Sequence, residues 1–100
     1  MNQTYAVIFT AELSADLEGY DETAARMREL VEKQPGFLGM QNVTEGGREI
    51  TVSYWNSLDD IRNWKAQPEH QRAQEAGRRK WYRRYKVEIA GIQRKYEFSE

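Results

Sequence analysis

Residues 37–55 read FLGMQNVTEGGREITVSYW, and this stretch decides the fold. The runs 37–44 and 49–55 are rich in β-branched and aromatic residues, as strands are. Between them, residues 45–48 contain Gly46-Gly47, and paired glycines supply the positive φ angles that a tight hairpin turn needs. We therefore predict two adjacent antiparallel strands.

Upstream of the hairpin we predict one strand and one helix. Residues 5–10 read YAVIFT and favour a strand. Residues 20–33 favour a helix, which Pro35-Gly36 ends. The apolar positions of this helix recur at steps of three and four, at Ala24, Met27, Leu30 and Val31.

Downstream, Ser57 is placed to cap a short helix whose apolar stripe is Leu58, Ile61 and Trp64. Pro68 fits the first turn of a second helix, predicted to run to about Tyr85. Residues 86–98 alternate as a last strand, with a bulge or bend at Gly91. The order β-α-β-β-α-β predicts a single α+β domain over residues 1–100, with the ferredoxin-like antiparallel sheet and helices on one face.

Both faces of the predicted sheet carry apolar side chains. In the first strand Tyr5, Val7 and Phe9 share one face, and Ala6 and Ile8 share the other. The helices can cover only one face, and a chain of 100 residues has no segment left for the second. We therefore expect a homodimer in which two sheets cover each other as a dimeric α+β barrel.

Composition excludes several classes of protein. The chain has no cysteine and one histidine, so disulfides, thiol catalysis and a metal site are not expected. No apolar run approaches the roughly 20 residues of a membrane span, and a cytoplasmic location is the default expectation. Residues 72–86 are basic and residues 12–32 acidic, but the net charge of −1 argues against nucleic acid as a partner.

Four segments resemble the antibiotic biosynthesis monooxygenase (ABM) superfamily of dimeric α+β barrels. They are QPGFLG at 34–39, YWNSL at 54–58, PEH at 68–70 and WYRRY at 81–85. The resemblance covers nearly the whole chain and implies a ligand cavity between the sheet and its helices or inside the barrel. Members include cofactor-independent oxygenases of aromatic polyketides, quinol oxygenases and haem-degrading enzymes, and the fold alone does not choose among them.

The resemblance argues against haem degradation. Relatives with that activity use an Asn on the first strand, a Trp that Trp64 matches, and a later His. The first strand lacks the Asn, Gln74 occupies the position of the His, and His70 lies one turn too early. We therefore expect no cofactor.

Cofactor-independent oxygenation of a small aromatic, polyketide- or quinol-like molecule fits better. A base removes a proton from the substrate, whose carbanion then gives an electron to oxygen in an apolar pocket. His70 is the candidate base near neutral pH, with Trp64 and Asn56 as the other candidate catalytic residues. Substrate contacts are expected from Trp55, Tyr54, Arg78, Trp81, Tyr82 and Tyr85.

Two other interpretations stay open. Trp64 and Trp81 can be plain core residues, and His70 can be exposed on its helix. The protein would then be a non-catalytic dimeric barrel that binds a small hydrophobic ligand or a partner. Nucleic-acid binding through the basic segment is the third hypothesis.

Overall fold

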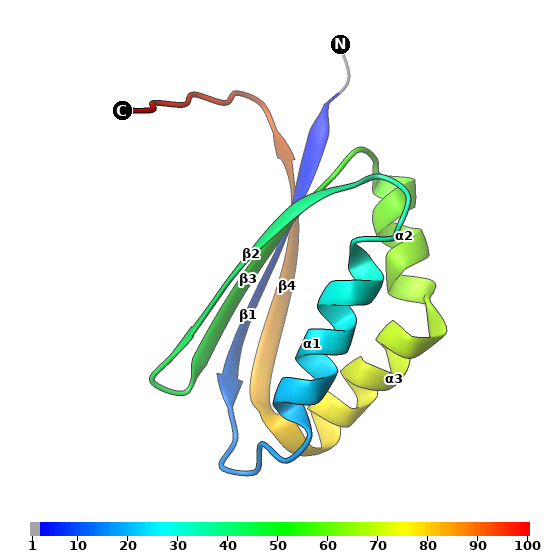
Figure 1. Ribbon diagram of the computed structural model, residues 1–100, viewed down its shortest axis with the longest axis vertical. Coiled ribbons are helices and arrows are strands. Elements are labelled where there is room, and N and C mark those ends of the chain that lie inside the picture. The colour runs from blue at the N-terminus through cyan, green and yellow to red at the C-terminus, as the bar shows by residue number, and fades with distance from the viewer. Residues whose placement is uncertain (1–2) are drawn as a thin grey trace.

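The computed structural model describes residues 3–100, which form one antiparallel sheet with three helices on one face (Figure 1). The elements are β1 (Thr4–Leu13), α1 (Tyr20–Val31), β2 (Phe37–Glu45), β3 (Arg48–Trp55), α2 (Leu58–Ala66), α3 (Pro68–Ala76), a π-helical turn (Gly77–Trp81) and β4 (Tyr82–Ile92). The strand order is β2-β3-β1-β4, with every neighbouring pair antiparallel. This is the predicted ferredoxin-like α+β fold.

Local signals in the sequence place the hairpin turn and the starts of two helices correctly. Gly46 and Gly47 have φ angles of 58° and 76°, so the hairpin uses the freedom that only glycine has without strain. The Ser57 side chain caps α2 by accepting a hydrogen bond of 3.0 Å from the Asp60 amide. Pro68 starts α3, as predicted. Within residues 3–100, no helix has both the length and the apolar character to cross a membrane.

The junction between the last helix and the last strand lies earlier than predicted. The helical turns end at Trp81 and not at about Tyr85, and β4 begins at Tyr82. Tyr82 is already paired with Leu13 of β1, and the Ser14 amide donates a 2.7 Å hydrogen bond to the Trp81 carbonyl. The ladder with β1 therefore takes the backbone groups that a longer helix would have used.

The last strand also ends earlier than predicted, at Ile92 and not at Phe98. Ile92 pairs with Thr4, which is the first residue of β1, so the ladder runs out of partner at this point. The following segment leads away from the sheet (Figure 1), and the Phe98 side chain is 92% exposed.

The irregularity predicted at Gly91 is located elsewhere. Gly91 pairs with Tyr5 in regular register. The register shift in this ladder falls between Glu12 and Leu13, where the chain enters β4 from the π-helical turn.

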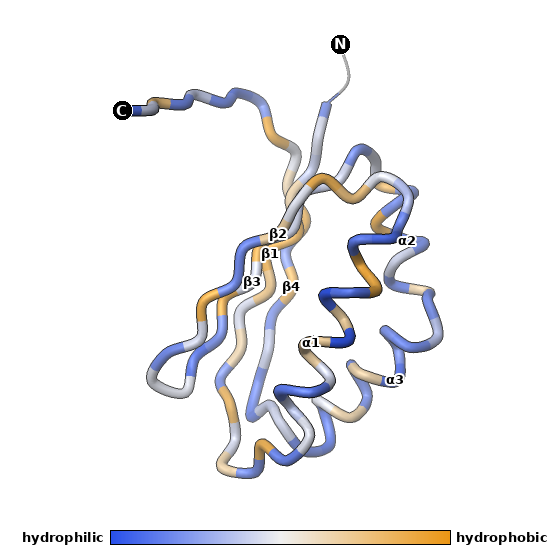
Figure 2. Tube along the Cα trace, viewed as in Figure 1, coloured by the Kyte–Doolittle hydropathy of each residue, from blue (hydrophilic) through white to orange (hydrophobic). Residues whose placement is uncertain are grey.

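The buried core lies between the sheet and the helices. Trp55 at the end of β3 is fully buried and packs with Val31 of α1 and Ile61 of α2. Because side chains alternate along a strand, β3 residues of the same parity as Trp55 face the helices. In Figure 2 apolar residues recur along the strands, whereas the helices are largely hydrophilic with interspersed apolar positions.

The opposite face of the sheet is apolar and uncovered in a single chain. Ile8 pairs with Val52 on this face, and Val43 pairs with Ile50 on the same side. Val43 is 64% exposed and Ile50 is 48% exposed. Homodimerisation through this face stays a prediction.

Candidate functional site

A cavity of about 850 Å³ lies between the helix-facing side of the sheet and the three helices. Part of its floor is made of small polar residues, Thr51 and Ser53 of β3 and Asn42 of β2. These side chains are too short to reach the helices, so space remains that larger apolar residues would have filled. The volume lies within the range of about 300–1,000 Å³ that is typical of small-molecule sites.

One end of the cavity holds three stacked rings. Trp55 lies beneath Trp64, with ring centroids 6.4 Å apart and planes 27° apart. Trp64 in turn stacks on His70, with centroids 4.0 Å apart and planes 12° apart. Trp55 is fully buried, whereas Trp64 and His70 are half-buried and line the cavity. The buried Trp55 therefore supports the Trp64 ring, and the Trp64 ring supports His70.

The protonation pattern of His70 follows from its contacts. Its Nδ1 lies 2.9 Å from the Trp64 carbonyl oxygen, and a carbonyl oxygen can only accept. Nδ1 therefore carries the proton, and Nε2 of the neutral ring is left with a free lone pair. Burial lowers the pKa of His70 below its ordinary value, against the smaller opposing effect of this hydrogen bond. His70 is thus held in the form of a base.

A second polar group is found at the other end of β3. The buried Glu49 accepts hydrogen bonds from the hydroxyls of Tyr20, Tyr82 (3.4 Å) and Thr51 (2.8 Å). Burial, followed by the adjacent Glu49, raises the pKa of both tyrosines well above the ordinary value, so both hydroxyls stay protonated. The sequence analysis overlooked Glu49 and Tyr20. The signal for Glu49 was its parity, which it shares with Trp55 and which directs it toward the helices.

The structure brings together six of the nine residues predicted for the site. The cavity lining includes Trp64, His70, Arg78, Trp81, Tyr82 and Tyr85.

Trp81 and Arg78 each donate a hydrogen bond to a neighbouring residue. Trp81 is buried at the lower end of the cavity, and its indole N–H donates a 2.8 Å hydrogen bond to the Glu18 carbonyl. Arg78 donates a 3.1 Å hydrogen bond to the Tyr85 hydroxyl. Trp81 therefore serves the core and the cavity wall together.

The other three predicted residues lie away from the cavity surface. Trp55 is beneath it, in the core. Tyr54 pairs with Ala6 on the opposite face of the sheet, because it neighbours the inward-facing Trp55 on an extended strand. Asn56 follows β3 and is exposed. Its backbone N–H donates a 2.9 Å hydrogen bond to the Gly36 carbonyl.

The residues of the cavity can be compared with those that bind metal ions and haem in other proteins. Within residues 3–100, no group of three or more His, Asp or Glu side chains is placed to hold a metal ion. Gln74, which the resemblance predicted to replace a haem-ligating His, lines the cavity. A carboxamide is not among the axial ligands that proteins use for haem iron.

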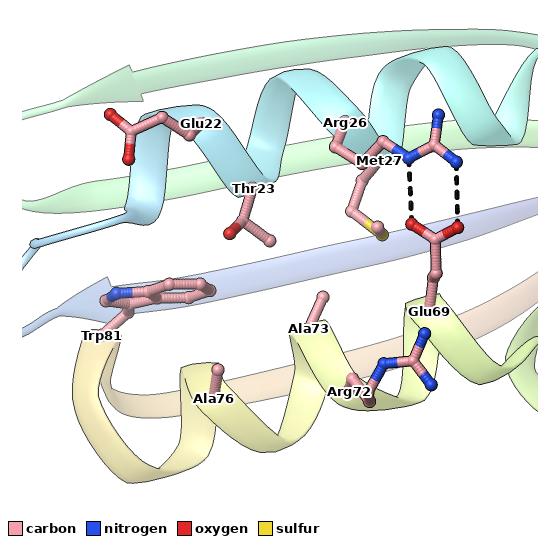
Figure 3. A pocket seen from close by; sticks show the side chains of 9 residues that line it. All are labelled: Glu22, Thr23, Arg26, Met27, Glu69, Arg72, Ala73, Ala76 and Trp81. Carbon is pink, nitrogen blue, oxygen red and sulfur yellow. Dashed lines mark hydrogen bonds and ion pairs between the residues drawn. The ribbon is translucent and has the colours of Figure 1, made fainter.

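A shallower groove of about 330 Å³ runs between α1 and α3 (Figure 3). At one end Arg26 and Glu69 form a bidentate ion pair with two N–O distances of 2.9 Å. Four residues line both the groove and the cavity, namely Thr23, Met27, Ala73 and Trp81. The two spaces therefore share one wall, which is a single layer of side chains thick.

Comparison with known proteins relates this arrangement to characterised folds. The chain is 50% identical over 97 residues to the uncharacterized protein YqjZ of Bacillus subtilis strain 168, covering 96% of this chain and 85% of that protein. A solved structure from Nitrosomonas europaea superimposes with a TM-score of 0.80 at 15% identity, covering 93% of each chain. A variant of SnoaB, a cofactor-independent oxygenase from Streptomyces nogalater, superimposes with a TM-score of 0.78 at 16% identity, covering 92% of this chain and 95% of SnoaB.

The structural likenesses establish the fold, and the family follows from the sequence match. The sequence model of the antibiotic biosynthesis monooxygenase family matches residues 6–76, which run from β1 to the end of α3. This range contains the stacked rings of Trp55, Trp64 and His70 and the buried Glu49. Because this match covers residues 6–76 of the 100-residue chain, the chain belongs to the antibiotic biosynthesis monooxygenase family.

Proposed function

We propose that the protein is a cofactor-independent oxygenase of a small, fused-ring aromatic substrate, and that His70 is its catalytic base. The observation that carries the proposal is the state of His70. Its Nδ1 donates to the Trp64 carbonyl at 2.9 Å, its ring stacks on Trp64, and burial lowers its pKa. A neutral imidazole in an aromatic-lined cavity is suited to remove a proton near pH 7.

The reaction needs a base, the substrate and O₂, and O₂ is the oxidant. His70 Nε2 takes a proton from an acidic ring carbon, and the carbanion gives one electron to O₂. The two radicals combine in a carbon–oxygen bond, and His70 returns its proton to the peroxide anion. The hydroperoxide then loses water to leave a carbonyl group. One oxygen atom thus enters the product and the other leaves as water. The half-buried Trp64 covers the reacting ring and limits the access of solvent.

Oxygen uptake tests the proposal directly. Purified protein is supplied with a panel of anthrones and quinols, and O₂ consumption and quinone absorbance are followed together. His70→Ala is expected to lower kcat/KM by about 10²–10⁴-fold, the usual contribution of a positioned base. Gln71→Ala is the matched control, because Gln71 is the next residue on α3 and its side chain is exposed. Unchanged turnover in His70→Ala, or no turnover with any member of the panel, would refute the proposal.

A non-catalytic ligand-binding role is the second candidate, and the position of Asn56 favours it. Asn56 was predicted to be a catalytic residue, but it is exposed and does not line the cavity. A cavity without the Asn56 side chain still binds a flat apolar molecule between the helices and the sheet. Stoichiometric quenching of tryptophan fluorescence by anthraquinones, without oxygen uptake from the matching anthrones, would select this role.

A further inference from the structure

Glu49 is a buried acceptor that the chemistry at His70 does not use. It is the second residue of β3, whereas Trp55 is the last. Six strand positions separate them, which corresponds to roughly 20 Å of backbone. Glu49 therefore acts on the part of a ligand that is remote from the stacked rings.

The hydrogen bonds at Glu49 identify it as a carboxylate with spare capacity. Asn42 donates to the Thr51 hydroxyl at 2.6 Å, so the Thr51 proton is directed to Oε2 of Glu49 at 2.8 Å. Oε1 accepts from Tyr20 and, at 3.4 Å, from Tyr82. A carboxylate offers about four acceptor positions, so one position remains on Oε2. The long bond to Tyr82 can also be exchanged for a ligand donor.

Nothing positive neutralises this charge at close range. Among residues 3–100, Glu49 forms no ion pair, although it is only 7% exposed. The cations that line the cavity, Arg28, Lys65 and Arg78, are all exposed. Exposed charges are screened by water and salt, whereas a buried charge is screened much less. Asp21, the other acid in the lining, is exposed and screened in the same way, so the negative potential at this end of the cavity comes chiefly from Glu49.

We propose that Glu49 is a specificity-determining residue, which selects an uncharged aromatic ligand with a hydroxyl donor at its remote end. A ligand with a carboxylate at that end is excluded, because two anions would share a poorly solvated space. The inference deepens the proposed function, since it assigns the substrate class of the same cavity. It applies equally to a protein that only binds its ligand.

Three anthraquinones of matched shape test the inference without turnover. They carry 2-hydroxymethyl, 2-methyl or 2-carboxylate groups, and binding is followed by quenching of tryptophan fluorescence. The wild-type protein is expected to bind the hydroxymethyl probe most tightly and the carboxylate probe most weakly. In Glu49→Gln the carboxylate probe should gain about tenfold or more, and the hydroxymethyl probe should lose affinity. Glu75→Gln, an exposed change on α3, should leave the order unchanged.

A second variant keeps the test independent of the folding of Glu49→Gln. Tyr20→Phe removes one donor but keeps the carboxylate, so it should tighten the hydroxymethyl probe and still exclude the carboxylate probe. The inference is overturned if the wild-type protein binds none of the three probes or binds all three equally. It is also overturned if folded Glu49→Gln keeps the wild-type order. Because all three probes are already quinones, an absence of oxygenase activity would defeat the proposed function and leave this result intact.

Discussion

The stacked tryptophans Trp55 and Trp64 give a test that separates the core from the cavity wall. Trp55 is fully buried, with its ring centroid 5.4 Å from that of Phe37 and 6.4 Å from that of Trp64. Trp55→Ala removes these contacts and leaves an enclosed void, which costs about 3–5 kcal/mol. Since a small domain is stable by only about 5–15 kcal/mol, this variant should be close to unfolding.

Trp64→Ala should behave differently, although the two rings are in contact. Trp64 is half-buried and borders the cavity, so its removal enlarges an existing space and creates no new enclosed void. Half of the burial energy of a large apolar side chain is about 0.8–1.5 kcal/mol. The greater loss should be in ligand affinity, because His70 loses its stacking partner and the cavity loses part of its wall.

Urea and thermal unfolding, followed by far-UV circular dichroism, measure both variants. At about 4–8 °C for each kcal/mol in a domain of this size, Trp55→Ala should lower Tm by at least about 12 °C. Trp64→Ala should lower Tm by less than half as much, while abolishing fluorescence quenching by 2-hydroxymethylanthraquinone. Equal destabilisation by the two substitutions would refute the division into core and cavity wall.

Three further predictions follow from other parts of the molecule. Because the folded-state pKa of His70 is lowered, the unfolded chain binds more protons between that pKa and the ordinary value of about 6.5. Stability should therefore fall as the pH falls below about 6.5, and a urea-unfolding series should lose this component in His70→Gln; an identical pH slope in both proteins would contradict the assignment. Sedimentation velocity should find a dimer at micromolar concentration and a monomer for Ile50→Lys on the uncovered sheet face, whereas a folded wild-type monomer would count against dimerisation. A Cβ at Gly77 would lie 2.5 Å from the Tyr82 ring, so Gly77→Ala should cost about 1–3 kcal/mol in urea unfolding and weaken ligand binding. Arg79→Ala on the same turn is the control, and equal effects of the two changes would show that the contact with Tyr82 is unimportant.

The candidate site was only partly predictable from the sequence. Trp64 could be assigned from the apolar stripe that it shares with Ile61, and His70 because it is the one histidine of the chain and can act as a base near neutral pH. Tyr54 was assigned to the pocket although it alternates with the inward-facing Trp55, so the parity of β3 should have excluded it. The same parity places Glu49 on the helix-facing side of the sheet, but its burial becomes evident only with its tyrosine partners.

Short-range physics determined much of this protein from its sequence alone. Gly46-Gly47 specified the hairpin, Ser57 and Pro68 specified two helix starts, and runs of β-branched and aromatic residues specified strands. Each of these depends on the conformational preferences of a few neighbouring residues.

Only the tertiary structure decided where β4 begins and ends, and which polar groups meet inside the cavity. The extent of β4 is set by the length of β1, whose Thr4 and Leu13 pair with Ile92 and Tyr82. The cluster at Glu49 joins Tyr20 from α1, 29 positions away, with Tyr82, 33 positions away. Such contacts depend on how the helices pack on the sheet, and no local preference in the chain encodes them.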